Sequence, residues 1–271
     1  MLKRIVVSVI LLPLLLLVLL WAPKICTALL FAALAGIAAW ELLRGTGLVR
    51  EIRLVIYTVA VAALVPIWSY FGCDGTLGEA GALIFFVLLF MEMLLSHGKL
   101  SFEKIAICVV GGLLIPYLLA SLVRIIADDN GRLLILVPFV IAFLSDSGAY
   151  FVGCAIGKHK MAPVISPKKS WEGFFGGLAT AILGMIVYAL IMSKFFQCEV
   201  NYLFAAIYGF VGALGGVFGD LCFSVIKRQT GIKDYGNLIP GHGGALDRFD
   251  SIIVVAPLVE LLLHFIPVVV K

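Results

Sequence analysis

The chain has 271 residues, of which 63% are hydrophobic and only 13% are charged, with a formal net charge of +4. An ordinary soluble domain carries about 25% charged residues, so this chain lacks the polar side chains that cover a water-exposed surface. The composition excludes a disordered chain, a coiled coil and a nucleic-acid-binding module, and predicts that lipid surrounds most of the chain.

Nine apolar runs follow one another, each close to the roughly 20 residues that a membrane-spanning helix needs. They cover residues 5–21, 23–43, 52–71, 78–96, 105–125, 133–154, 173–193, 202–226 and 249–270. The runs are continuous rather than alternating, which favours helices over barrel strands. Backbone groups in lipid must bond within their own segment. The sequence therefore predicts an all-α, polytopic integral membrane bundle of about nine transmembrane helices.

The first run follows Lys3 and Arg4, as a secretory signal would, but no small-residue cleavage site follows Trp21. We therefore expect an uncleaved first span. With nine spans and a cytoplasmic N-terminus, 15 Lys and Arg residues fall on the cytoplasmic side and five on the other. That bias is the one expected for cytoplasmic loops, and it predicts the inner (cytoplasmic) membrane with both polar loops facing the cytoplasm.

Residues 1–135 carry little chemistry, and we expect them to form structural helices that also serve a homodimer. Glu41 is expected to form an interfacial pair with Arg44, and Glu92 to hydrogen-bond between helices. Residues 136–271 are predicted to be the catalytic region, with cytoplasmic loops at 155–172 and 227–248.

The six cysteines are scattered along the chain. We interpret them as small apolar membrane residues rather than as metal ligands or disulfides.

Two aspartates, Asp146 and Asp220, are embedded in apolar helices. A carboxylate there costs several kcal/mol unless it is paired or metal-bound, so a functional role is the first reading and a structural ion pair the alternative. Asp220, Ser224 and Lys227 fall at i, i+4 and i+7, on one helix face. Gly212 and Gly216 continue that face and allow a second backbone to approach closely, either within the chain or at a dimer interface.

The second loop ends in Asp247, Asp250 and Ser251, which we expect to share one face in the first turn of the last helix, where the helix dipole favours anions. Glycines beside His242 allow backbone N–H groups to bind phosphate. Acids, cations and glycines together indicate Mg²⁺-assisted phosphoryl or nucleotidyl transfer. A loop lying on anionic lipid headgroups is the alternative, but it has no need of the acids.

Three segments carry a resemblance to a known family. Residues 224–250 (Ser-x-x-Lys-Arg-x(4)-Lys-Asp-x(5)-Pro-Gly-His-Gly-Gly-x(2)-Asp-Arg-x-Asp) resemble the signature of the CDP-diacylglycerol synthases, or phosphatidate cytidylyltransferases. Residues 146–150 and 166–173 are similar to upstream elements of the same family. Cys154 and Cys222 depart from it, because many members have a polar or charged residue there.

The resemblance implies that CTP and phosphatidate react to give CDP-diacylglycerol and pyrophosphate in phospholipid biosynthesis, with one or more Mg²⁺ ions as the cofactor. Asp220 and Asp247 are the first candidates for metal ligands, and Asp250 and Asp146 complete or support the shell. The remaining candidates are cations, hydroxyls and loop residues for the triphosphate and the lipid phosphate: Lys227, Arg228, Ser224, Lys233, Asp234, His242, Gly243, Gly244, Arg248, Ser166, Lys168 and Lys169. Of these, Lys227 and Arg228 are placed with the two aspartates in the catalytic group.

Two other functions stay open at this point. A CTP-dependent lipid-alcohol (polyprenol-type) kinase would transfer the γ-phosphoryl group instead of the cytidylyl group. A cation or proton transporter would also place acids inside a helical bundle, but it predicts acids spread through the membrane rather than gathered at one side.

Overall fold

The computed structural model describes residues 2–73, 75–128, 130–238 and 243–270, with the side chains of residues 11–269 among them. Two compact units make up the chain. The first contains residues 1–129 and 227–249, and the second contains residues 130–226 and 250–271. The boundary near residue 130 lies close to the predicted boundary at 135, but residues 227–249 of the second polar loop belong with the N-terminal half.

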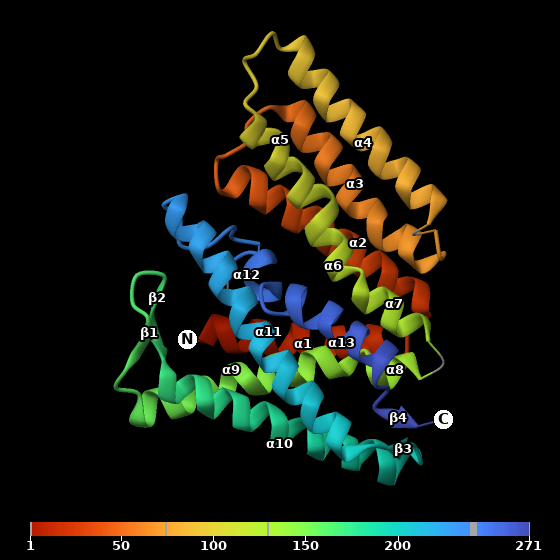
Figure 1. Cartoon of the computed structure of the whole chain (residues 1–271), viewed down its shortest axis with the longest axis vertical. Helices are drawn as coiled ribbons and strands as arrows, with labels where there is room; N and C mark the ends of the chain where they lie inside the picture. Colours follow the sequence, from red (N-terminus) through yellow and green to blue (C-terminus); the bar gives the residue numbers. More distant parts are fainter. Residues whose placement is uncertain (1, 74, 129, 239–242, 271) are drawn as a thin grey trace. The chain divides into compact units, whose positions relative to one another are not determined.

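All regular elements described in the first unit are helices or helical turns. These are α1 (Leu2–Leu20), α2 (Lys24–Trp40), the π-helical turn η1 (Glu41–Gly45), α3 (Ile52–Tyr70), α4 (Thr76–Leu95), α5 (Phe102–Val109), a second π-turn η2 (Val110–Leu114), α6 (Ile115–Leu119), α7 (Ser121–Ala127) and α12 (Leu246–Phe249). Helices α2 and α3 pack along each other, α4 lies against α3, and the stretch from η2 to α7 packs on both α2 and α3 (Figure 1).

Small side chains explain the close packing of α2 on α3. Helix α2 buries a row of alanines together with Gly36. A Cβ atom at Gly36 would lie 3.6 Å from the Cβ of Ala63 on α3, so the two backbones are already near van der Waals contact there. Because lipid offers no hydrophobic drive between helices, such close contact between small residues is what holds membrane helices together.

The second unit combines long helices with two short strand pairs. Its elements are α8 (Gly131–Leu134), α9 (Leu136–Ile156), β1 (Lys160–Ala162), β2 (Ser166–Ser170), α10 (Trp171–Phe196), β3 (Glu199–Val200), α11 (Tyr202–Gln229, whose last three residues are counted with the first unit), α13 (Ile252–Phe265) and β4 (Val269–Val270). Strands β1 and β2 form an antiparallel hairpin, and β3 pairs with β4, also antiparallel, although α11, α12 and α13 lie between them in the chain. Helices α9 and α10 run side by side below this hairpin (Figure 1).

Seven helical segments among the described residues are long and apolar enough to cross a membrane. They are Lys24–Gly45, Ile52–Tyr70, Thr76–Leu95, Phe102–Ala127, Gly131–Ile156, Trp171–Phe196 and Tyr202–Gln229. The predicted all-α polytopic membrane architecture is therefore confirmed. Each of the nine predicted apolar runs contains a helix, but the first and the last contribute only the shorter apolar stretches Leu11–Leu20 and Ile252–Phe265, and the last run ends in β4. At 1.5 Å per residue, the 14 residues of α13 cover about 21 Å, less than the roughly 30 Å hydrocarbon core.

The predicted glycine face of α11 is a packing surface inside the second unit. Gly212 lies against Ile141 of α9, and Gly216 lies against Val255 of α13. A Cβ atom at Gly219 would lie 2.6 Å from the backbone carbonyl oxygen of Asp250, so only glycine fits there. These glycines are buried within one chain, which removes the Gly212 and Gly216 face as a dimer interface.

Candidate active site

The carboxylate of Asp220 lies at the centre of a polar group in the second unit. Its Oδ1 accepts a hydrogen bond of 3.1 Å from the hydroxyl of Ser224, one turn further along α11. Its Oδ2 lies 2.5 Å from the Nζ of Lys169, and the two side chains are about a quarter exposed. The predicted i, i+4 pairing of Asp220 with Ser224 is confirmed, and Lys169 neutralises the carboxylate.

The β1–β2 hairpin places Lys169 beside this carboxylate. The sequence predicted only a loop at residues 155–172, whereas Lys160 pairs with Ser170 and Ala162 pairs with Ser166 across two strands. Successive side chains of a strand point to opposite faces, so Lys168 and Lys169 are directed differently. Lys168 is exposed, and Ser166 is partly buried.

Ser170 ends the hairpin and begins α10. Its side chain accepts a hydrogen bond of 3.2 Å from the amide of Gly173, which is the usual N-cap contact. Gly173 also packs against α9, because a Cβ atom there would lie 2.7 Å from the carbonyl oxygen of Ala149. The cap and the tight helix contact fix the direction in which the hairpin leaves the helix pair.

A second carboxylate, that of Asp247, organises the polar loop of the first unit. Oδ1 accepts a bond of 2.9 Å from the Nζ of Lys227, and the side chains of the two residues are only 2% and 12% exposed. Oδ2 accepts bonds from the amides of Tyr235 (2.8 Å) and Gly244 (3.0 Å). The Lys227 ammonium also lies 5.5 Å from the centre of the Tyr235 ring. Asp247 thus joins three points of the loop, and the Gly244 amide, predicted to bind phosphate, donates to it here.

Gly243 requires glycine for two separate reasons. Its φ of +84° lies in the left-handed region that side chains disfavour. A Cβ atom there would also lie 2.9 Å from Oδ2 of Asp247 and 3.4 Å from Asp234. The predicted candidates Asp234, Gly243 and Asp247 are therefore neighbours.

Glu41, at the end of α2, is a site residue that sequence reasoning placed wrongly. Its carboxylate is 4% exposed and accepts bonds from the amides of Ala245 (3.1 Å) and Leu246 (2.8 Å). Arg44, its predicted partner, instead donates to the carbonyl of Arg50 and lies over the Trp40 ring. The acceptors are more than 200 residues from the donors, so no local spacing could have revealed the contact.

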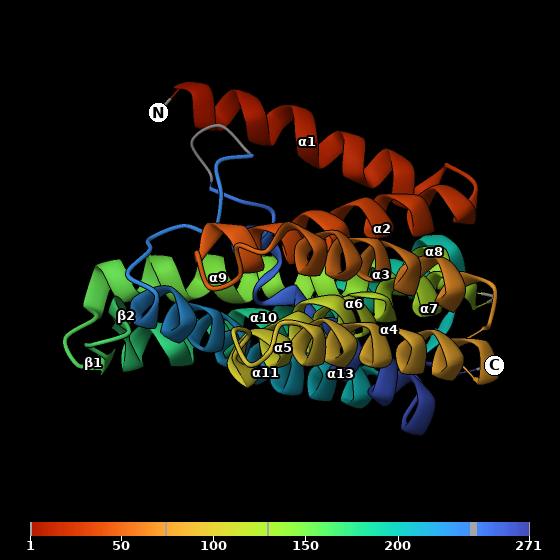
Figure 2. The same cartoon turned by 90° about the horizontal axis from the view of Figure 1, so that it is seen from above.

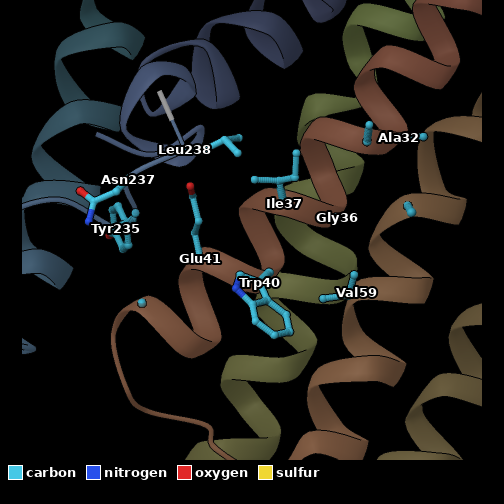
Figure 3. A pocket seen from close by; sticks show the side chains of 13 residues that line it. Ala32, Gly36, Ile37, Trp40, Glu41, Val59, Tyr235, Asn237 and Leu238 are labelled. Atoms are coloured by element: carbon cyan, nitrogen blue, oxygen red, sulfur yellow. The ribbon is translucent and has the colours of Figure 1, made fainter. Parts of the chain in front are cut away.

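A cavity of about 690 Å³ in the first unit adjoins Glu41. It is lined by α2, by Val59 and Ala63 of α3 and by residues 235–238, and most of the lining is apolar. Figure 3 shows the Glu41 side chain rising from α2 toward the loop, with Tyr235 and Asn237 on one side and Ile37 and Trp40 on its own helix. The same unit viewed from above has α1 lying over α2 (Figure 2).

The other predicted site residues have different surroundings. Arg228, Lys233, Asp234, Arg248 and Asp146 are exposed, whereas Asp250 is buried, with Oδ1 accepting a bond from the amide of Ser251. His242 lies outside the described residues, so its predicted phosphate contact stays a prediction.

The sequence predicted that Asp247 lies in the first turn of the last helix, and this prediction is wrong. Asp247 belongs to the four-residue helix α12, a turn follows at residues 250–251, and α13 begins at Ile252. Asp247, Asp250 and Ser251 therefore do not share one helical face. The amides of Gly244, Ala245 and Leu246, just before and at the start of α12, donate to Asp247 and Glu41.

The oxygen ligands of the Asp220 group suit a magnesium ion. Mg²⁺ is usually held by one or two carboxylates, with substrate phosphates and water as its other ligands. Asp220 and Ser224 provide a carboxylate and a hydroxyl, and Lys169 is a cation that an incoming metal ion would displace. Among the residues that the structure describes, no three or more His, Cys, Asp or Glu side chains form a group that could hold an ion.

Comparisons with known proteins identify the family of the chain. The model of the cytidylyltransferase family matches residues 2–266. The chain is 32% identical to the phosphatidate cytidylyltransferase of Bacillus subtilis over 249 residues, covering 89% of each chain. It is 40% identical over 170 residues to the protein of the same name from Staphylococcus epidermidis strain RP62A, covering 62% of this chain and 63% of that one. A Haemophilus influenzae phosphatidate cytidylyltransferase is 40% identical over 137 residues, or 51% and 48% of the two chains. The chain belongs to the cytidylyltransferase family.

Proposed function

We propose that the chain is a phosphatidate cytidylyltransferase, which joins CTP and phosphatidate into CDP-diacylglycerol and releases pyrophosphate. The observation that carries the proposal is the arrangement around Asp247, where Lys227, Tyr235 and Gly244 converge on one buried carboxylate. These residues belong to the segment whose pattern resembles the family signature. Relatives that bear this name, and that match most of the chain, support it.

In the proposed reaction, a phosphate oxygen of phosphatidate forms a bond to the α-phosphorus of CTP, and the bond from that phosphorus to the pyrophosphate oxygen breaks. The attacking oxygen is already anionic at neutral pH, so proton removal contributes little. Magnesium would neutralise charge on the phosphate oxygens. Asp220 and Asp247 are proposed to hold it, with Asp250 and Asp146 in support.

The cations have the proposed task of holding the anionic substrates. Lys227, Arg228, Lys233 and Arg248 would hold the triphosphate and the leaving pyrophosphate. Lys168 and Lys169 would hold the lipid phosphate, with Lys169 passing from Asp220 to that phosphate when a metal ion takes its place. Ser166, Ser224, Asp234, His242, Gly243 and Gly244 are proposed to line the substrate site.

The lipid substrate also needs an apolar place for its acyl chains. The cavity lined by α2, α3 and residues 235–238 has a volume within the range of small-molecule sites and an apolar wall, and it adjoins the polar loop of the same unit. We assign it to an acyl chain of phosphatidate. The positive-inside count further supports an inner-membrane protein whose N-terminus and polar loops face the cytoplasm, where CTP is found. A homodimer stays part of the proposal.

Pyrophosphate release tests this function. Purified protein in detergent with phosphatidate, CTP and Mg²⁺ should release pyrophosphate only when both substrates are present, and a chelator should stop the release. Diacylglycerol in place of phosphatidate serves as the control, because it lacks the attacking phosphate. Release of CDP with diacylglycerol, whose free hydroxyl can accept the γ-phosphoryl group, would instead favour the lipid-alcohol kinase.

A further inference from the structure

The contact between Glu41 and the start of α12 is not used by the proposed reaction, yet the surrounding structure is built around it. Both carboxylate oxygens are engaged, one by each of two successive amides. The residue is 4% exposed at the end of an apolar helix. A buried carboxylate is costly unless hydrogen bonds compensate it, so these two amides are what make the charge tolerable.

Three glycines clear the space that Glu41 and its helix need. A Cβ atom at Gly236 or at Gly244 would collide with the Glu41 carboxylate. A Cβ atom at Gly45 would collide with the carbonyl of Tyr235. Gly236 and Gly244 stand on the two sides of residues 237–243, so one carboxylate contacts both ends of this loop. The π-turn at Glu41–Gly45 is the kind of helix distortion that occurs often at functional sites.

The same loop ends are those that Asp247 joins. The amide of Gly244 donates to Asp247, and the next two amides donate to Glu41. Tyr235, which donates to Asp247, is the neighbour of Gly236. A shift of α12 away from Glu41 would therefore move Asp247 relative to Lys227.

We propose that Glu41 is a positioning residue, which fixes the start of α12 so that Asp247 and Lys227 are held in reactive geometry. The proposal rests on the proposed cytidylyl transfer for its effect on turnover. Glu41 acts through α12, at the ends of the loop that carries the proposed phosphate-binding residues.

Substitutions at Glu41 and Gly236 test the proposal by kinetics. Gln at position 41 has one oxygen and one NH₂ group, so it can satisfy only one of the two amides and opposes the other. Losing such a charged hydrogen bond should lower kcat of Glu41→Gln by roughly tenfold to a hundredfold. The KM for CTP should change less than twofold. In Gly236→Ala the added Cβ atom would collide with the same carboxylate. The backbone φ of residue 236 is not in the left-handed region, so the substitution itself adds no backbone strain. We expect this variant to lower kcat as well.

The double variant Glu41→Ala/Gly236→Ala separates this role from general destabilisation. Without the carboxylate there is no collision at residue 236, so the double variant should be no slower than Glu41→Ala alone. Independent, multiplying losses would overturn the proposal. Glu92→Gln is the matched control, because Glu92 is also a glutamate of an apolar helix, but its carboxylate is bound by Tyr57 and Arg53 rather than by α12. Its kcat should remain that of the wild type.

Hydrogen–deuterium exchange supplies a readout that needs no activity. The amides of Ala245 and Leu246 should exchange at least tenfold faster in Glu41→Gln than in the wild type or in Glu92→Gln. Unchanged exchange would overturn the contact itself. Faster exchange with an unchanged kcat would overturn the positioning role. A wild type that releases no pyrophosphate would refute the proposed function, and with it the catalytic role of Glu41, whereas the exchange result would still report on the contact.

Discussion

The carboxylates of Asp220 and Asp247 have different surroundings, which give the two residues different roles. Asp220 is about a quarter exposed and is held by Lys169 and Ser224. Asp247 is nearly inaccessible and accepts three hydrogen bonds. The first carboxylate can exchange its partner for a metal ion at little structural cost. The second one would have to give up at least one of these contacts to bind a metal ion as proposed, which would disturb the loop that it holds.

Asp220→Asn is the sharper test of the chemistry. The amide keeps the size of the side chain and the Ser224 contact but loses the charge that a metal ion and Lys169 require. Turnover should fall by at least about a hundredfold, the order of loss seen when one transition-state-stabilising group is removed. The chain should keep its helical circular dichroism and its elution volume. Glu103→Gln, which removes an exposed carboxylate at the start of α5, is the control. Activity near that of the wild type in folded Asp220→Asn would refute the ligand role.

Asp247→Asn should instead lower stability as well as activity. It leaves the ammonium of Lys227 buried without a counter-charge, which costs about 3–5 kcal/mol. The thermal midpoint of the purified protein should drop by several degrees, and further than in Asp220→Asn. The double variant Lys227→Met/Asp247→Asn should regain part of the loss because no unpaired charge remains. An unchanged midpoint for Asp247→Asn would contradict the buried pair.

At the scale of the elements, short-range patterns were predictable and long-range contacts were not. Helical spacing predicted the pairing of Asp220 with Ser224 and the glycine face of α11, because both depend only on the 3.6-residue period. The hairpin at Lys160–Ser170 was missed, since its strands are short and polar. The contact of Glu41 with the start of α12 joins residues some 200 positions apart, so no local pattern could have shown it.

The cavity between α2, α3 and residues 235–238 gives a prediction at the same scale. Ala33→Trp would place a large ring in the lining of the cavity. The KM for phosphatidate should rise about tenfold, and the KM for CTP should stay within twofold. Leu29→Trp, an exposed position of α2 outside the cavity lining, is the matched control. Equal effects of the two variants would refute the assignment of the cavity to an acyl chain.

For the whole molecule, composition alone predicted the class. A chain that is 63% hydrophobic has too few charges for a soluble surface, and the seven long apolar helices in the described part of the chain confirm the membrane architecture. The number of spans was less predictable, because hydropathy marks an apolar run but not where its helix ends. Residues 227–249 belong with the N-terminal half, which was expected to be chemically bland. The N-terminal half nevertheless contributes to the candidate site, because Glu41 at the end of α2 binds backbone amides of this polar loop.

The central claim is that the cytidylyl group itself moves onto the lipid. The most direct measurement incubates the purified protein with phosphatidate, Mg²⁺ and CTP labelled at the α-phosphorus, followed by extraction of the lipid phase. The account predicts label in the lipid, and its loss in Asp220→Asn. A lipid phase without label, despite consumption of CTP by folded protein, would contradict it.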